Sequence, residues 1–191
     1  MQARARATRH NLLSHTAAAL AECGYAGTTT QEVCRRAQVS RGTLQYHFPT
    51  RTDLLVGALD FVLTSAVDSF VAEAARDGLT AADLVPRMWT HWQGPALTAW
   101  LELAVASRTE PELRAPMQEV MEAFDQRIHA TFAHLFGDEA IAEQHRRSAP
   151  LLLFAILNGL SVSRAYEPPG QSDDILALTQ QLSMLFLGSP S

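Results

Sequence analysis

The stretch that decides the fold runs from Thr28 to Asp53 and reads TTTQEVCRRAQVSRGTLQYHFPTRTD. It predicts a helix, a tight turn, a second helix, a short stop and the start of a long helix. The second helix, residues 40–48, is short and polar, although the segments on both sides of it are rich in core-forming residues. Such a helix is poor core material, and its residue types suit DNA phosphates and base edges.

Short-range signals set the boundaries of these helices. A threonine at position 28 or 29 can cap the first helix, and Glu32 has the spacing from Thr29 that completes a capping box. Gln38 and Val39 form the turn, and Ser40 caps the second helix. Pro49 ends the second helix because proline cannot continue the helical hydrogen bonds. The stretch therefore predicts a helix-turn-helix.

The rest of the chain predicts further helices, because apolar residues recur at three- and four-residue spacing. The predicted ranges are 9–23, 51–76, 81–93, 96–107, 110–136, 140–166 and 173–187. Residues 1–8 alternate alanine and arginine and predict a mobile arm, which either reaches a minor groove or simply frays. No segment alternates with a period of two, so we predict an all-α fold of about nine helices.

Charge is distributed unevenly along the sequence. The first 55 residues hold seven arginines against Glu22, Glu32 and Asp53, a balance of +4, whereas the whole chain carries −5, so the remainder carries −9. A basic N-terminal quarter on an acidic body is expected when one end of a protein meets a polyanion. Hydrophobic residues make up 47% of the chain, which is enough for a core and argues against disorder.

Several classes of protein and site are disfavoured. Cys23 and Cys34 form neither a disulfide scaffold nor a CxxC motif, which fits a reducing cytoplasm. Glu122, Asp125 and His129 share a helical face that a metal could use, but a solvated acidic face is the stronger interpretation. We find no nucleophile motif, phosphate loop, signal peptide or apolar run long enough to span a membrane. We therefore predict no enzyme, no cofactor and no metal site.

The segment from Arg9 to Leu55 resembles the N-terminal domain of the TetR family of bacterial transcriptional regulators. The matching residues are Gly24-Tyr25, Thr28-Thr29, Val33, Arg35-Arg36-Ala37, Val39–Leu44, Tyr46–Pro49 and Arg51–Leu55. The resemblance implies a three-helix DNA-binding domain at residues 1–50, with its basic arm. It also implies a helical ligand-binding and dimerisation domain at residues 51–191.

The resemblance and the side-chain chemistry together give the DNA-binding candidates. Thr28 or Thr29, at a helix N-terminus, suits a phosphate, and Arg41 suits a guanine edge or a phosphate. Tyr46 and His47 suit phosphates that set the docking depth. At the position of Arg51 the family usually has lysine or arginine, which contacts the DNA backbone. The full set is Thr28, Thr29, Ser40, Arg41, Gly42, Thr43, Gln45, Tyr46, His47 and Arg51.

Two residues depart from the family pattern. Gln45 stands where an aromatic residue is frequent, and glutamine can pair with adenine, so base preference is expected to differ. Gln38 stands where glycine is frequent in the turn, and a left-handed glutamine costs about 1–2 kcal/mol. Neither departure weakens the resemblance, but both bear on the operator sequence.

The remainder of the chain holds candidates for an effector pocket and a dimer interface. Methionine and aromatic residues suit an adaptable pocket for a small apolar or amphipathic ligand, although each alone is more often core. These candidates are Met88, Trp89, Trp92, Trp100, Met121, Phe124 and His129. The apolar run 149–162 and the last helix predict a two-fold interface between two copies, formed by Leu153, Ile156, Leu157, Leu160, Ile175, Leu178, Leu182 and Leu185.

We therefore expect a cytoplasmic homodimeric regulator, most simply a repressor, that binds a palindromic double-stranded DNA operator and responds to a ligand. The alternative is a helical ligand-binding or scaffolding protein without a primary DNA function. Salt-dependent binding to specific DNA distinguishes the two hypotheses.

Overall fold

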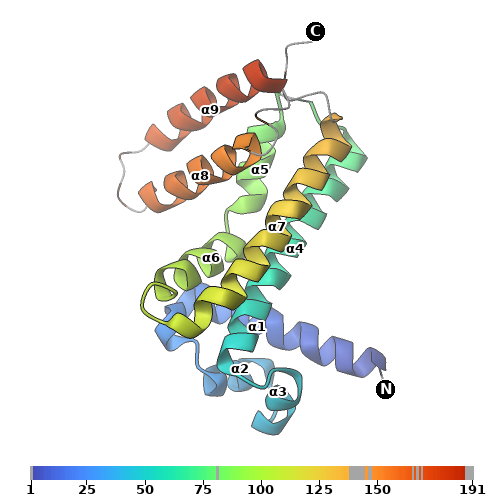
Figure 1. Ribbon diagram of the computed structural model, residues 1–191, viewed down its shortest axis with the longest axis vertical. Helices are drawn as coiled ribbons and strands as arrows, with labels where there is room; N and C mark the ends of the chain where they lie inside the picture. The colour runs from blue at the N-terminus through green and yellow to red at the C-terminus, as the bar shows by residue number, and fades with distance from the viewer. Residues whose placement is uncertain are drawn as a thin grey trace. The chain divides into compact units, whose positions relative to one another are not determined.

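The computed structural model is all helical over the residues it describes, which are 2–80, 82–137, 145, 148–164, 166, 168 and 170–187. Nine helices lie within these ranges and are labelled in Figure 1. They are α1 (Gln2–Gly27), α2 (Thr30–Ala37), α3 (Arg41–His47), α4 (Arg51–Asp77), α5 (Leu84–Trp92), α6 (Pro95–Ala106), α7 (Pro111–Phe136), α8 (Ser148–Ser163) and α9 (Gln171–Leu187). The predicted all-α class, with an N-terminal helix-turn-helix, is confirmed.

The chain divides into two compact units. The first comprises Met1–Ser65 and Gly94–Phe124, and the second comprises Ala66–Gln93 and Asp125–Ser191. Helices α4 and α7 each begin in the first unit and end in the second. The predicted boundary between residues 50 and 51 separates a DNA-binding domain from a ligand-binding and dimerisation domain. A division of the chain by packing does not test such a boundary, so it stays a prediction.

One apolar cluster of the first unit joins α1 to the helix-turn-helix. It comprises buried apolar residues of α1, α2 and the start of α4, together with two residues that anchor α3. These residues are Leu12, Leu13, Val33, Ala37, Leu44, Phe48, Leu54 and Ala58. Because α3 contributes only Leu44, with Phe48 just after it, the rest of that short helix remains available at the surface.

The mobile arm predicted for residues 1–8 is wrong, because α1 is already helical at Gln2. Alanine and arginine are both strong helix formers, and this propensity outweighs the lack of a buried face. The stop predicted at Gly24 is present as a break inside α1, since Gly24 has φ 68° and ψ −178°. Such a conformation is almost restricted to glycine.

The second unit is held by polar contacts between helices as well as by its core. The indole N–H of Trp92 donates to Asn158 Oδ1 at 2.8 Å, which joins α5 to α8. The backbone N–H of Val85 donates to Gln180 Oε1 at 3.1 Å, which joins α5 to α9.

The starts of two helices differ from the predicted starts. Helix α5 begins three residues later than expected, and most of the predicted start at 140–147 lies outside the described residues.

Among the described helices, α4 is the one whose length and composition would suffice to cross a bilayer, and half of its most apolar stretch is buried inside the protein.

Candidate nucleic-acid interface

The turn between α2 and α3 has the geometry of a helix-turn-helix. Thr29 caps α2 by accepting the Glu32 N–H at 3.1 Å. Gln38 ends α2 in the left-handed conformation, with φ 55° and ψ 43°, and its N–H returns to the Cys34 carbonyl. The side chain of Asn11 on α1 donates to the Ala37 carbonyl at 2.9 Å. The turn is therefore braced from α1 at the residue just before the strained glutamine.

Helix α3 presents its polar side to solvent. Ser40 caps it, because its hydroxyl oxygen accepts the Thr43 N–H at 3.1 Å. Leu44 and Phe48 are buried, while Arg41, Gln45 and Tyr46 are exposed, with Tyr46 at 81%. Nothing in the unit's own packing requires these exposed side chains, so they are available to a partner.

The stop after α3 and the start of α4 form as the sequence predicts. Thr50 and Asp53 make a reciprocal capping box. The Thr50 N–H donates to Asp53 Oδ2 at 2.9 Å, and the Asp53 N–H donates to Thr50 Oγ1 at 3.0 Å. A hollow of about 250 Å³ lies beside α3, lined by Thr30, Arg41, Leu44, Gln45, Phe48, Pro49, Thr50 and Arg51.

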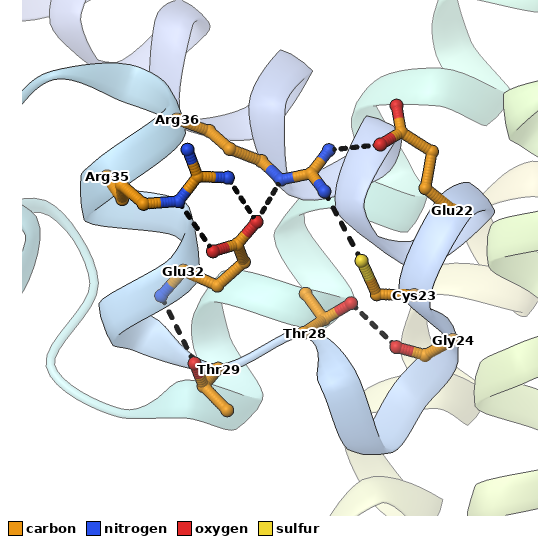
Figure 2. A network of polar contacts seen from close by, with 8 residues as sticks. All are labelled: Glu22, Cys23, Gly24, Thr28, Thr29, Glu32, Arg35 and Arg36. Carbon is orange, nitrogen blue, oxygen red and sulfur yellow. Dashed lines mark hydrogen bonds and ion pairs between the residues drawn. The ribbon is translucent and has the colours of Figure 1, made fainter.

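Figure 2 shows an ion-pair network on α2 that joins it to α1. Glu32 accepts two bonds from Arg35, at 2.7 and 2.8 Å, and one from Arg36 at 2.6 Å. Arg36 also donates to Glu22 at 2.7 Å and to the sulfur of Cys23 at 3.2 Å. The hydrogen bonds from Arg35 and then Arg36 lower the pKa of Glu32 to about 2. The two arginines that looked basic in sequence are thus neutralised within the protein.

Two of the predicted DNA contacts lie in structural positions instead. Thr28 is only 1% exposed, and its hydroxyl donates to the Gly24 carbonyl at 2.7 Å. The Arg51 guanidinium donates to the carbonyls of Thr28, at 3.1 Å, and Tyr25, and it lies 4.2 Å from the centre of the Tyr25 ring. Neither side chain points freely to solvent, so the structure does not support direct phosphate contacts from them.

Glu102 on α6 takes part in this site, although nothing in the sequence indicated it. Its Oε2 accepts the Tyr25 N–H at 2.6 Å. The same atom lies 2.9 Å from where a Cβ on Gly24 would stand, so a residue with a Cβ would require this carboxylate to shift, in addition to adopting an unfavourable φ. Tyr25 is therefore held by the carboxylate of α6 and the guanidinium of α4. No local signal links residues 77 positions apart.

Comparison with known proteins agrees with this geometry. Residues 12–58 match the family model described as bacterial regulatory proteins, tetR family. An uncharacterized HTH-type transcriptional regulator of Mycobacterium tuberculosis is 28% identical over 178 residues, which cover 91% of this chain and 90% of that protein. The chain belongs to the TetR family. It is thus a TetR-family transcriptional regulator with a helix-turn-helix.

Solved structures share the whole fold with this TetR-family chain. A Rhodococcus protein described as a TetR-family transcriptional regulator superposes with a TM-score of 0.70 at 24% identity, covering 93% of this chain and 98% of that one. A transcriptional regulator from Saccharomonospora viridis, solved in complex with choline, has a TM-score of 0.65 at 21% identity and covers 93% and 95% of the two chains. At these identities, the likeness concerns the fold.

The candidate ligand residues of this TetR-family chain fall in both units. Met88, Trp89 and Trp92 on α5 are buried in the second unit, where His129 is half-buried and its Nε2 lies 3.2 Å from Asp125 Oδ1. The Arg164 guanidinium lies 5.6 Å from the ring centre of Trp89. In the first unit, Phe124 is buried and Trp100 and Met121 are half-buried. The assignment of these seven residues to a ligand stays a prediction.

The candidate dimer residues separate into two groups by exposure. Ile175, Leu178 and Leu182 on α9 are exposed, the last two by 55% and 45%. On α8, by contrast, Leu153, Leu157 and Leu160 are buried in their own chain, so burial does not support an intermolecular role for them. Ile156 is half-buried, and the side chain of Leu185 lies outside the described residues. The exposed leucines of α8 are Leu151 and Leu152, which the sequence-based choice missed.

Neither cysteine pairs in a disulfide. Cys23 is exposed and Cys34 is half-buried, and burial raises the pKa of the Cys34 thiol. Over the part of the chain that the structure describes, no three histidine, cysteine, aspartate or glutamate side chains gather as a metal site would require.

Proposed function

We propose that this TetR-family protein is a non-enzymatic, ligand-responsive repressor that works in the cytoplasm and binds a palindromic operator as a homodimer. The observation that carries the proposal is the exposed polar side of α3. Arg41 and Gln45 stand one helical turn apart on a helix that Ser40 caps and Leu44 anchors. Side chains of these types read guanine and adenine edges in a major groove.

The exposed apolar face of α8 and α9 supports a homodimer. It comprises Leu152, Ile175, Leu178 and Leu182, and Leu152 and Leu182 line one hollow between the two helices. A contiguous apolar face on a monomer marks an interaction surface, and a two-fold arrangement covers the same face on both copies. A two-fold dimer presents its recognition helices to half-sites about 34–36 Å apart, which is why we expect a palindromic operator.

The aromatic residues of α5 support a small apolar or amphipathic effector. Trp89 and Trp92 are buried in the second unit, and the face of Trp89 already accepts the Arg164 cation. Tryptophan faces bind cations, including quaternary ammonium groups. The Saccharomonospora viridis regulator was solved with choline, a ligand that carries such a group. Choline is therefore a reasonable first compound to test with this chain.

The connection between effector and DNA runs along α4. This helix begins at Arg51, four residues after α3 ends, and extends into the second unit. A displacement of α4 would shift α3 relative to its groove, because only residues 48–50 separate the two helices. The effector must bind more tightly to the form that has low DNA affinity, since equal affinity for both forms would shift nothing.

The test is a map of genomic DNA fragments that the purified protein retains, repeated with candidate effectors. We expect retention of a few fragments that contain an inverted repeat, a steep fall in affinity with salt, and release by an effector. Failure to bind any fragment at low salt would refute the DNA function and favour a ligand-binding or scaffolding role. Binding that no effector alters would refute ligand responsiveness alone.

A further inference from the structure

The arginines of the first 55 residues are not equally available to a polyanion. Arg35 and Arg36 are paired with Glu32 and Glu22. Arg51 is engaged with the backbone carbonyls of residues 25 and 28. In the described part of the chain, the arginines of this region that form neither an ion pair nor a hydrogen bond to a backbone carbonyl are Arg4, Arg6, Arg9 and Arg41. Three of these four lie at the start of α1.

The start of α1 is a helix without a buried face of its own. The first buried apolar residue is Leu12, whereas Arg4, Arg6 and Arg9 are exposed. No acidic residue precedes Glu22 in the sequence. Arginines near a helix N-terminus are unfavourable, because their charge is repelled by the positive end of the helix dipole. This arrangement becomes favourable when an anion lies close by.

The basic start of α1 adjoins the end of the recognition helix. The Arg9 guanidinium lies 5.1 Å from the centre of the Phe48 ring, and Phe48 directly follows the last residue of α3. The seven residues before Arg9 that are helical extend about 10 Å further, at about 1.5 Å per residue. In Figure 1 this end of α1 points away from the other helices of its unit.

We propose that residues 2–9 of α1, which we name the basic N-terminal helix, bind DNA phosphates that flank the half-site read by α3. The proposal rests on the DNA-binding function proposed above and adds a second contact surface to it. A protein helix about 10 Å long spans about three phosphates of one DNA strand, because phosphates follow one another at about 3.4 Å along the DNA axis. The contact involves charge and backbone only, so it lengthens the footprint without adding sequence preference.

The first experiment measures operator affinity against salt for the wild type and for the double variant Arg4→Gln/Arg6→Gln. Each phosphate contact contributes about 0.9 to the slope of log affinity against log salt, and the dimer would lose four contacts, two from each copy, so we expect the slope to fall by about 3.6. The loss of affinity between about 50 and 200 mM salt would then be about 150-fold smaller than in the wild type. Hydroxyl-radical footprinting should show lost protection on the flanks of each half-site and retained protection at its centre.

Arg108→Gln is the matched control, because Arg108 is an exposed arginine in the connection between α6 and α7. Its slope should equal that of the wild type. If the double variant behaves like Arg108→Gln, the proposal is refuted while the DNA function stands. If the wild type binds no DNA at low salt, both are refuted.

A second variant tests whether the contact needs a helix. Ala3→Gly/Ala7→Gly keeps every charge but weakens the helix at two exposed positions. We expect weaker operator binding and the same loss of flanking protection. Full affinity and an unchanged footprint in this variant would show that the arginines act from an extended arm, which would overturn the helical contact proposed here.

Discussion

Gly24→Ala tests the contacts between Glu102 and residues 24 and 25, which precede the helix-turn-helix. Gly24 has φ 68° and ψ −178°, a conformation in which a residue with a Cβ costs about 1–3 kcal/mol. The new Cβ would also lie 2.9 Å from Glu102 Oε2, so the carboxylate must move. Moving it weakens the 2.6 Å bond from the Tyr25 N–H, and complete loss of a hydrogen bond to a charged group would cost about 1.5–3 kcal/mol.

We therefore expect Gly24→Ala to lower the free energy of unfolding by about 1–3 kcal/mol from strain, plus up to about 3 kcal/mol from the weakened bond. Glu102→Ala removes the bond alone and should cost about 1–3 kcal/mol. In the double variant the carboxylate is already absent, so the alanine adds only strain. The two losses should then fall short of additivity by the cost of the weakened bond, which is up to about 3 kcal/mol.

Urea denaturation followed by helical circular dichroism measures these free energies. Gly78→Ala is the control, because Gly78 also has a positive φ, 73°, but nothing within 4 Å of an added Cβ. It should show strain without coupling to Glu102. Strict additivity of the Gly24 and Glu102 variants, or a loss in Gly24→Ala no larger than in Gly78→Ala, would refute the reasoning.

Four further predictions concern single side chains. Gln45→Ala should weaken operator binding by about 1–3 kcal/mol and relax base preference at one position per half-site, as measured by selection from random DNA; an unchanged profile would show that Gln45 reads no base. Gln38→Gly should stabilise the protein by about 1 kcal/mol and raise its Tm by about 2–4 °C, because glycine tolerates φ 55° without strain, and a lower Tm would contradict this. The pKa of Glu32 is lowered to about 2 in the folded protein, so its ion pairs stabilise the fold above the ordinary glutamate pKa of 4.5 and cease to do so as the pH falls towards 2. The gap in unfolding free energy between the wild type and Glu32→Gln should therefore be constant above about pH 5 and shrink below it, whereas a gap that does not change with pH would count against the pairing. Leu178→Arg, in the exposed apolar face of α9, should shift the protein towards monomer in sedimentation while its helical content is unchanged; an intact dimer would exclude that face.

The helix-turn-helix was predictable because its signals are local. Ser40, Pro49 and the Thr50–Asp53 pair act within three residues of themselves, and each behaves in the structure as its type requires. The strained turn at Gln38 was foreseeable for the same reason. The exposed residues of α3 followed from composition alone, because a short polar helix between apolar segments has no core to face.

Other features depended on information that the local sequence lacks. For residues 1–8 the lack of apolar residues predicts no helix, although alanine and arginine favour one. The partner of Tyr25 is 77 residues away, so Glu102 gave no sign of its role. On α8, apolar periodicity identified Leu157 as buried but left open whether its own chain or a second copy covers it.

The way Tyr25 is gripped has a consequence for the evolution of this protein. Glu102 accepts a hydrogen bond from a backbone N–H, and Arg51 donates to backbone carbonyls. These contacts, which hold the segment before α2, therefore do not depend on the side chains at positions 25 and 28. Arg41 and Gln45, which face solvent, take no part in them. Mutations of α3 that change the operator preference therefore need no compensating change in the contacts that Glu102 and Arg51 make. This makes α3 a suitable segment for grafting foreign specificities.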